Sequence, residues 1–281
     1  MKNIKTQLSL ALALGLAGTA LAGTLAASAQ DCTPMHKITT VEAGYLTVAA
    51  PTFPPFSIPK GEFDVTGVDG EIVKEIAARE CLKIKVAPVE YATAIPFVLS
   101  GRADVAIGNY YRTDERSKAV NLSAPLYLDE MGLYSKEGVT TVAQLEGRNV
   151  GTVQGYLWVN ELKTILGDKL SLYNNYIALY QDLEAGRIEI AIDGIAVGTA
   201  AQQGGALKGI QIKASEKDDR VQASVYPAQC GLPLSKNNPE LLAAADDIVA
   251  ELHKSGRIVE ILGQFGLSPS AADVGEPRLI K

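Results

Sequence analysis

Short β-like runs alternate with helical patterns along this chain, and that alternation limits its fold more than any other feature. A strand-like run, Tyr45 to Ala50, precedes a helical pattern that runs to Glu80 with Asp69 as its expected N-cap. An alternating strand pattern over 82–89 follows. Strands that alternate with helices form parallel or mixed sheets. The sequence therefore predicts an α/β fold.

The alternation continues through the second half of the chain. Residues 135–138 read as a connection, and Thr141 with Gln144 forms a possible capping box for a short helix. The other expected elements are helices over 94–100, 177–185, 239–254 and 257–265, and strands over 103–108, 149–153, 172–173, 188–193 and 226–234. Ligands of such sheets bind at the carboxyl ends of strands. The candidate loops are those after Ala50, Val89, Gly108, Val153 and Asp193.

The N-terminus has the anatomy of a secretory signal peptide. Lys2 and Lys5 precede an apolar run from Leu8 to Leu21, and a small-x-small cleavage site ends at Ala29. A retained membrane anchor is the alternative, but the run is short of the roughly 20 apolar residues that a span needs. We expect cleavage after Ala29 and a soluble, periplasmic mature protein.

Charge and cysteine content narrow the function. Removal of the signal peptide leaves 24 basic and 32 acidic residues, so the formal net charge changes from −6 to −8. Such an acidic chain without a basic cluster is a poor binder of nucleic acid. Two histidines and the absence of CxxC and HExxH motifs argue against a metal site, and no cofactor is expected. In an oxidising compartment we expect one disulfide, Cys32–Cys81, with one thiol left over.

Residues 95–127 read IPFVLSGRADVAIGNYYRTDERSKAVNLSAPLY, a helix–strand step, a T-x-E-R turn and an S-x-P-Y-like segment. This segment resembles the family 3 periplasmic solute-binding proteins, the polar amino-acid receptors of ABC importers. The stretches APTFPPF, GVDGEIVKEIA, LEGRNVGTVQG and NPELLAAADDIVAELHKSGRIVEILGQFG fit the same family in the same order. The resemblance covers essentially all of the mature chain.

The resemblance implies a two-lobed periplasmic-binding-protein fold, with two hinge strands and a ligand cleft between the lobes. The implied parts are a signal peptide over 1–29, a first lobe over 30–134, a second lobe over 135–227 and a return to the first lobe over 228–281. The hinges are expected near 133–136 and 226–232. The implied function is capture of an amino acid or a related small molecule by a monomer, for delivery to the permease of an ABC importer.

The family pattern also suggests the residues that hold the two ends of an amino acid. Arg116 matches the arginine that grips the ligand's α-carboxylate, a task that suits its planar, two-donor fork. Asp193 resembles the aspartate that pairs with the α-amino group, although the expected position, counted from Gly186, is Gly194. Because a slip of one residue reverses the facing of a strand residue, a structural role for Asp193 stays open.

Aromatic residues are expected to form the walls. Phe53 and Tyr91 match positions that meet the ligand in the family, whereas Phe56 is assigned to packing. Ala50 and Tyr111 depart from the family pattern, which argues against an ordinary small amino acid and favours an aromatic, cyclic or cationic side group. The candidate ligand-binding residues are Phe53, Tyr91, Asn109, Tyr110, Tyr111, Arg116, Gly155, Tyr156 and Asp193.

Two other functions compete with the receptor. Some dehydratases resemble these receptors and act on ring-bearing carboxylates; Glu90 is the one carboxylate that we would nominate as a general acid or base. A sensor module is the third possibility, but such modules normally continue into a membrane span.

Overall fold

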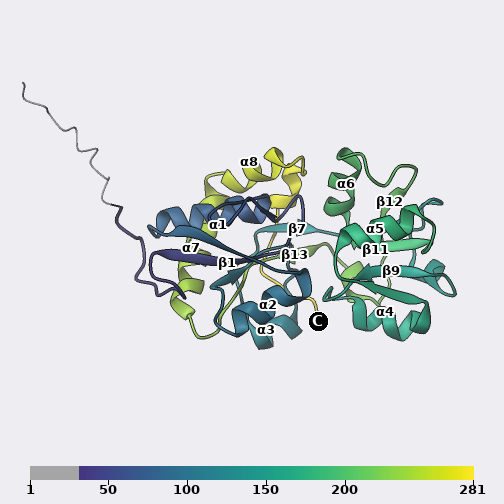
Figure 1. The fold of residues 1–281 in the computed structure, drawn as a ribbon, viewed down its shortest axis with the longest axis horizontal. Helices are drawn as coiled ribbons and strands as arrows, with labels where there is room; N and C mark the ends of the chain where they lie inside the picture. Colours follow the sequence, from purple (N-terminus) through teal and green to yellow (C-terminus); the bar gives the residue numbers. More distant parts are fainter. Residues whose placement is uncertain (1–31) are drawn as a thin grey trace, which may run out of the picture. The chain divides into compact units, whose positions relative to one another are not determined.

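Two five-stranded sheets organise the protein in the computed structural model, which describes residues 32–281 (Figure 1). The strand order is β4-β1-β5-β14-β6 in the first sheet and β10-β9-β11-β8-β12 in the second. We call each sheet with its helices lobe 1 and lobe 2, respectively. The expected signal peptide and its cleavage site after Ala29 lie outside the described residues.

Lobe 1 is built on a buried parallel strand, β1 (Tyr45–Ala50), which pairs with β4 (Lys83–Pro88) and β5 (Val105–Ala106). The last part of the chain returns to this sheet through β14 (Pro233–Leu234), antiparallel to β5 and to β6 (Asn121–Leu122). In Figure 1, α1 and α8 lie above the strands, and α2 and α3 lie below them. The other elements of lobe 1 are α1 (Val68–Arg79), α2 (Tyr91–Leu99), α3 (Asp114–Ala119), α7 (Pro239–Lys254), α8 (Arg257–Gln264), the hairpin of β2 (Ile58–Pro59) and β3 (Val65–Thr66), and the 3₁₀ helix η4 (Pro269–Ala272).

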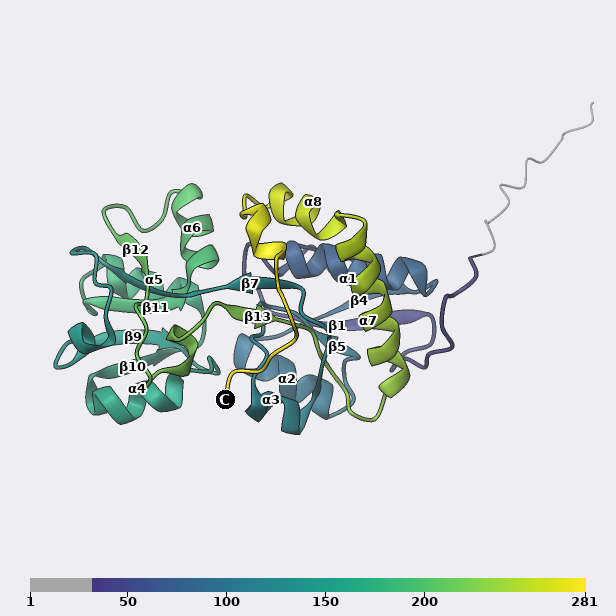
Figure 2. The same ribbon diagram turned by 180° about the vertical axis from the view of Figure 1, so that it is seen from behind.

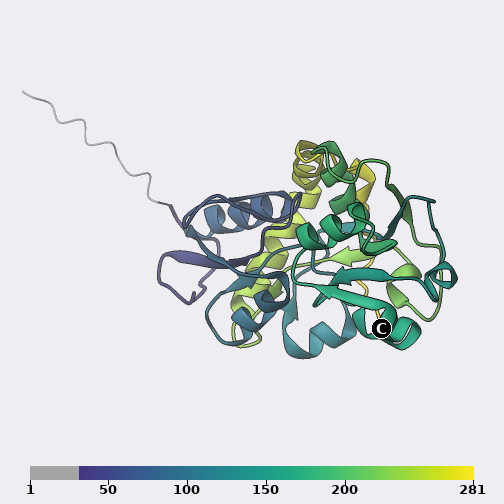
Figure 3. The same cartoon turned by 45° about the vertical axis from the view of Figure 1, so that its right-hand side comes forward.

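Lobe 2 has β9 (Val150–Val153) between two parallel partners, β10 (Leu170–Tyr173) and β11 (Ile190–Gly194). On the other side of β11, β8 (Met131–Ser135) runs antiparallel and carries the edge strand β12 (Gln211–Ala214). Figure 3 brings this sheet forward, with helices on both of its faces. The helices are α4 (Val159–Leu166), α5 (Tyr176–Glu184), α6 (Ile195–Gln203) and the 3₁₀ helices η1 (Val142–Leu145), η2 (Gly167–Lys169) and η3 (Gln222–Ser224).

Two short antiparallel strands, β7 (Tyr127–Asp129) and β13 (Ala228–Cys230), carry the chain between the two sheets. β13 falls within the expected second hinge, 226–232. The first crossing comes earlier than the expected 133–136, because β8 pairs with β11 from Met131 onward and so already belongs to the sheet of lobe 2. The hinge is therefore the β7–β13 pair, and Glu130 is the residue that links β7 to β8.

The start of α1 differs from the prediction. Its N-cap is Gly67, so the expected N-cap role of Asp69 is wrong. Gly67 has φ +102°, and a Cβ on it would lie 2.4 Å from the carbonyl oxygen of Phe56, so the chain passes too closely for any other residue. Asp69 lies in the first turn of α1 and is 1% exposed. Its side chain is therefore free for a tertiary contact.

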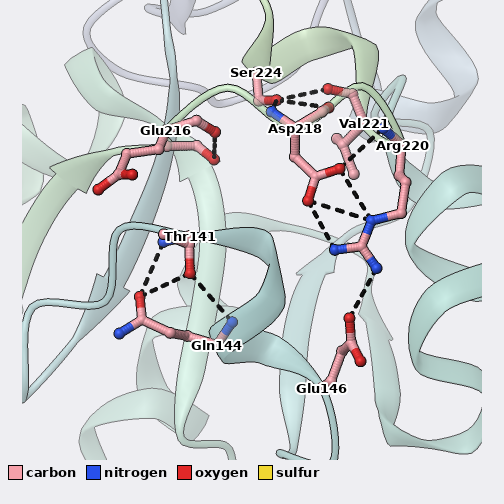
Figure 4. A network of polar contacts seen from close by, with 9 residues as sticks. Thr141, Gln144, Glu146, Glu216, Asp218, Arg220, Val221 and Ser224 are labelled. Carbon is pink, nitrogen blue, oxygen red and sulfur yellow. Dashed lines mark hydrogen bonds and ion pairs between the residues drawn. The ribbon is translucent and has the colours of Figure 1, made fainter.

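The predicted capping box of Thr141 and Gln144 forms in lobe 2. The Thr141 hydroxyl accepts from the backbone amide of Gln144, and the side-chain oxygen of Gln144 accepts from the backbone amide of Thr141 (Figure 4). These two bonds complete the capping box of η1. In the same view, the Arg220 guanidinium joins Asp218 to Glu146. These contacts fix the loop that leads back toward the hinge.

The C-terminal segment after η4 is tied to the hinge, and Figure 2 shows it in yellow passing β7 and β13. The Gln229 side chain in β13 donates to the carbonyls of Val274 and Glu276. Ile280 forms a parallel bridge with Thr113, the N-cap of α3. The segment thus connects a hinge strand to the start of α3.

The cysteines follow the expected division. Cys32 and Cys81 are disulfide-bonded, and Cys230 is a free, buried thiol in β13. None of the helices between residues 32 and 281 combines the length and hydropathy that crossing a membrane requires.

Candidate ligand-binding site

Both lobes contribute residues to one small cavity beside the hinge. Seven of the nine candidate residues line it. The lining residues are Phe53, Tyr91, Asn109, Tyr111, Arg116, Tyr156, Leu157, Trp158, Asp193 and Gly194. Its free volume is only about 20 Å³, roughly the space that one water molecule needs. The two lobes are in contact here, since the Arg116 guanidinium of lobe 1 donates to the Gly155 carbonyl of lobe 2.

Arg116 lies in the first turn of α3, which begins because the Thr113 hydroxyl accepts from the Arg116 amide (3.0 Å). The expected T-x-E-R turn is thus the start of a short helix. One terminal nitrogen of the Arg116 guanidinium donates to the Tyr111 carbonyl (2.8 Å), and the other reaches the Gly155 carbonyl in lobe 2 (3.2 Å). No ion pair among residues 32–281 involves Arg116. Two of its five N–H donors are used in these bonds and a third faces the Tyr91 hydroxyl, so two remain for an anion.

Asp193 is fully buried near the end of β11 and lines the cavity. Its carboxylate accepts from the hydroxyls of Tyr156 and Tyr180 (2.8 Å each) and from the Gly194 amide (2.7 Å). No lysine, arginine or histidine of the described chain pairs with it. Burial raises the pKa of Asp193 to about 7, against the lowering effect of these donors. A cation brought to this carboxylate would relieve the cost of its burial.

Aromatic rings from both lobes meet around the cavity. Phe53 and Tyr91 of lobe 1 lie 6.1 and 4.9 Å from the ring of Tyr156 in lobe 2, measured between ring centroids. Trp158 lies 5.1 Å from Tyr156 and 6.0 Å from Tyr111. Burial raises the pKa of Tyr91 to about 12, so its hydroxyl remains a neutral hydrogen-bond donor. The walls thus offer ring faces and edges together with phenol groups.

Two predicted site residues are close to the cavity without lining it. Tyr110 lies behind Tyr91, with ring centroids 4.7 Å apart, and its hydroxyl donates to the Tyr91 carbonyl (2.8 Å). The Gly155 carbonyl accepts from the guanidinium of Arg116, which lines the cavity. Tyr110 therefore positions Tyr91, and Gly155 helps to hold the two lobes together.

The turn at Gly108 and Asn109 is held from below by Asp69. One carboxylate oxygen of Asp69 accepts from both backbone amides of the turn (2.8 Å each), and the other accepts from the Tyr127 hydroxyl. These bonds keep Asn109 in its left-handed conformation, φ +60°. Asp69 thereby orients the side chain of Asn109, and the helix α1 positions one wall of the cavity.

Sequence reasoning missed two lining residues, Leu157 and Trp158, and considered the third, Gly194, only as the position where the family pattern expects an aspartate. Trp158 is the only tryptophan of the chain and follows the end of β9 by a few residues, a signal that could have identified it. Phe56 is a packing residue as predicted, because its ring stacks on Tyr127 at 5.2 Å away from the cavity.

Little in the site supports the alternative catalytic function. Glu90, the nominated general acid or base, is exposed at the start of α2 and does not line the cavity. Within residues 32–281, no group of three or more His, Cys, Asp or Glu side chains is placed to hold a metal ion.

Known proteins resemble most of the described chain. The model of the bacterial extracellular solute-binding proteins, family 3, matches residues 46–268. The L-cystine-binding protein of Escherichia coli (strain K12) is 27% identical over 214 residues, which cover 74% of this chain and 76% of that protein. The lysine/arginine/ornithine-binding periplasmic protein of the same strain is 27% identical over 212 residues, 73% of this chain and 80% of that protein.

Solved structures agree with this assignment. An ancestral arginine-binding protein bound to glutamine is 26% identical, with a TM-score of 0.70, and covers 80% of this chain and 99% of that chain. An ancestral arginine-binding protein bound to arginine gives a TM-score of 0.69 at 26% identity, over 79% of this chain and 98% of that chain. The match of the family model to most of the chain, and of the fold to these receptors, means that this protein belongs to the bacterial extracellular solute-binding proteins of family 3 and is a receptor, not an enzyme.

Proposed function

We propose that this receptor captures an L-α-amino acid with a cationic or ring-bearing side chain and delivers it to the permease of an ABC importer. The observation that carries the proposal is the pair of oppositely charged groups in one cavity. Arg116 comes from lobe 1 and Asp193 from lobe 2, and neither has an ion-pair partner within residues 32–281. An amino-acid zwitterion supplies one partner for each.

In this proposal Arg116 binds the α-carboxylate, and the acidic end of the cavity at Asp193 binds the α-ammonium group. The two N–H donors of Arg116 that bond neither Tyr111, Gly155 nor Tyr91 allow a two-donor contact with a carboxylate. Because the ligand then joins groups of both lobes, it binds the closed state better than the open one and shifts the hinge equilibrium toward closure.

The aromatic walls support the choice of side chain. The rings of Phe53, Tyr91 and Trp158 can stack on a planar side group or face a cation, and either contact contributes about 0.5–2 kcal/mol. Related receptors are named for L-cystine, for lysine, arginine and ornithine, and for histidine. The closed cavity is far smaller than such ligands, so their entry requires opening at the β7–β13 hinge and movement of these rings.

The remaining parts of the proposal concern partner and assembly. The functional unit in this proposal is a monomer, whose two lobes together line the cavity. Export through the N-terminal signal peptide would bring it to the compartment in which importer permeases meet their receptors.

A thermal-shift panel tests the proposal. The mature chain is heated with L-arginine, L-lysine, L-histidine, L-cystine, aromatic amino acids, polyamines, betaines and ring-bearing carboxylates, because a ligand that binds only the native state raises the melting temperature. We expect a rise with one class of α-amino acid and no change in its mass by mass spectrometry. A rise confined to amines or to ring-bearing carboxylates would overturn the assignment.

A further inference from the structure

Gly194 has no side chain, and this leaves an opening at the end of the cavity where Asp193 lies. It is the last residue of β11, and its backbone (φ −67°, ψ 141°) suits any L-amino acid. What blocks a side chain is a neighbour from the hinge, since a Cβ on Gly194 would lie 2.5 Å from Oδ2 of Asp129. The carboxylate of Asp129 therefore occupies the space that a side chain at position 194 would fill.

Asp129 ends the hinge strand β7 and is 5% exposed. Its Oδ2 accepts from the Asn109 side-chain amide (2.6 Å) and from the Tyr111 hydroxyl (3.1 Å). Asn109, Tyr111 and Gly194 all line the cavity, so three lining residues surround this oxygen. No cationic side chain among residues 32–281 pairs with Asp129. A buried carboxylate without a cation costs free energy that an incoming cation recovers.

The charges around the cavity are unequal. Asp129 and Asp193 lie on either side of Gly194, against the single guanidinium of Arg116. We propose that Asp129 is a second binding residue for the ligand's α-ammonium group, which it reaches from the hinge strand through the opening left by Gly194. This assignment rests on the proposed function.

Because Asp129 lies in a hinge strand, an ammonium group bound to it would also affect the closure of the two lobes. Its carboxylate bonds Asn109 and Tyr111 of lobe 1, touches Gly194 and accepts from the Ala196 amide (3.4 Å) of lobe 2. An ammonium group bound here is held at the hinge itself. Binding the amino end then favours the same β7–β13 geometry that brings the two lobes together.

A second cavity, of about 350 Å³, lies on the other side of Asp129 and is lined by α6 and η4. Asp129 and the neighbouring Glu130 both line this second cavity. The Asp129 carboxylate also bonds Asn109 and Tyr111 of the first cavity, whereas the Glu130 side chain has no such bond within residues 32–281. Glu130 is exposed and carries the same charge on the same hinge. Glu130→Gln is therefore a matched control for the loss of one hinge carboxylate.

Isothermal titration calorimetry at pH 8 tests the assignment. L-arginine, L-lysine and L-histidine are titrated beside their α-deamino analogues, δ-guanidinovaleric, ε-aminocaproic and imidazolepropionic acid. We expect Asp129→Asn to weaken binding of the amino acid by about 30-fold or more, the loss of a charge-assisted contact. The deamino analogue should change by less than about threefold, because it lacks the group that Asp129 contacts. Glu130→Gln should change neither.

In the second measurement, the carboxylate is moved from position 129 to position 194. In the double variant Asp129→Ala with Gly194→Asp, the blocking oxygen is gone, and the next neighbour of the new Cβ is the Asn109 side-chain nitrogen at 3.5 Å, an ordinary contact. This variant should bind the amino acid at least about tenfold better than Asp129→Ala alone.

The outcomes separate the two claims. Wild-type protein that binds none of these three amino acids and none of the other α-amino acids of the thermal-shift panel overturns the proposed function. Wild-type binding with equal losses for amino acid and deamino analogue in Asp129→Asn overturns the ammonium contact and leaves Asp129 a structural hinge residue. Failure of the double variant to recover affinity, with a melting temperature like that of Asp129→Ala, also contradicts the assignment.

Discussion

Replacement of Arg116 gives a graded prediction whose size follows from the donors that the structure leaves free. Arg116 keeps two donors on the carbonyls of Tyr111 and Gly155 and one toward the Tyr91 hydroxyl, and presents two others. A two-donor contact with a carboxylate contains two charge-assisted hydrogen bonds of about 1.5–3 kcal/mol each. Arg116→Ala should therefore cost about 3–6 kcal/mol of binding free energy, or about 10²–10⁴-fold in Kd.

Arg116→Lys should give an intermediate loss. The ammonium group keeps the charge but cannot present two parallel donors, so one bond is lost, at about 1.5–3 kcal/mol or roughly 10–150-fold in Kd. Lys118→Ala is the matched control, because Lys118 lies in the same helix, is exposed and pairs only with Asp114. Its Kd should not change.

The assay is calorimetric titration with L-arginine and with its carboxamide, in which the carboxylate is replaced. The carboxamide should bind wild-type protein weakly and Arg116→Ala about equally weakly, because both lack the same contact. A Kd for Arg116→Ala within about threefold of wild type, in a variant that melts at the wild-type temperature, would refute the carboxylate role.

Four further changes can be measured. Because burial raises the pKa of Asp193 to about 7 and the ligand's ammonium group needs the ionised form, affinity for L-arginine should be full above pH 7 and fall about tenfold per unit below it. The free protein should respond oppositely: a raised folded-state pKa stabilises the protonated native state, so Asp193→Asn should remove a gain in melting temperature that wild type shows between pH 8 and 5. Gly67→Ala should lower the free energy of unfolding by about 2 kcal/mol or more in a denaturant titration, because the new Cβ meets the Phe56 carbonyl at positive φ. Binding should change the fluorescence of Trp158, the only tryptophan, and Trp158→Phe should abolish that signal while binding persists by calorimetry.

Hydrogen bonds between residues close in sequence explain the part of the fold that was predicted well. Asn238 caps α7 with Pro239 in its first turn, and Thr141 with Gln144 closes the predicted capping box. Such contacts join residues only a few positions apart, so the residue pattern that forms them can be recognised from the sequence alone.

Contacts that span the fold were less predictable. Asp69 looked like an N-cap, but its carboxylate holds the turn at Asn109, about 40 residues away. Tyr110 belongs to the ligand loop by pattern, yet it faces the back of Tyr91. The facing of one side chain at the end of a strand depends on register and on neighbours, which periodicity does not encode.

The acidic end of the site illustrates the same limit. The family pattern pointed to position 194 or its neighbour Asp193, and the structure brings Asp193 into the cavity wall. The role of Asp129 could not be predicted, because only the packing of β7 against the end of β11 shows that its carboxylate fills the space beside Gly194.

The central claim is that one cavity recognises both ends of an α-amino acid, and a single calorimetric comparison tests it most directly. Wild-type mature protein is titrated with L-arginine, with its carboxamide and with δ-guanidinovaleric acid. The account predicts tight binding of L-arginine, or of L-lysine or L-histidine in the equivalent series, and a loss of about 100-fold or more for each analogue, since each leaves one buried charge unpaired. Equal binding of the amino acid and either analogue would contradict the account.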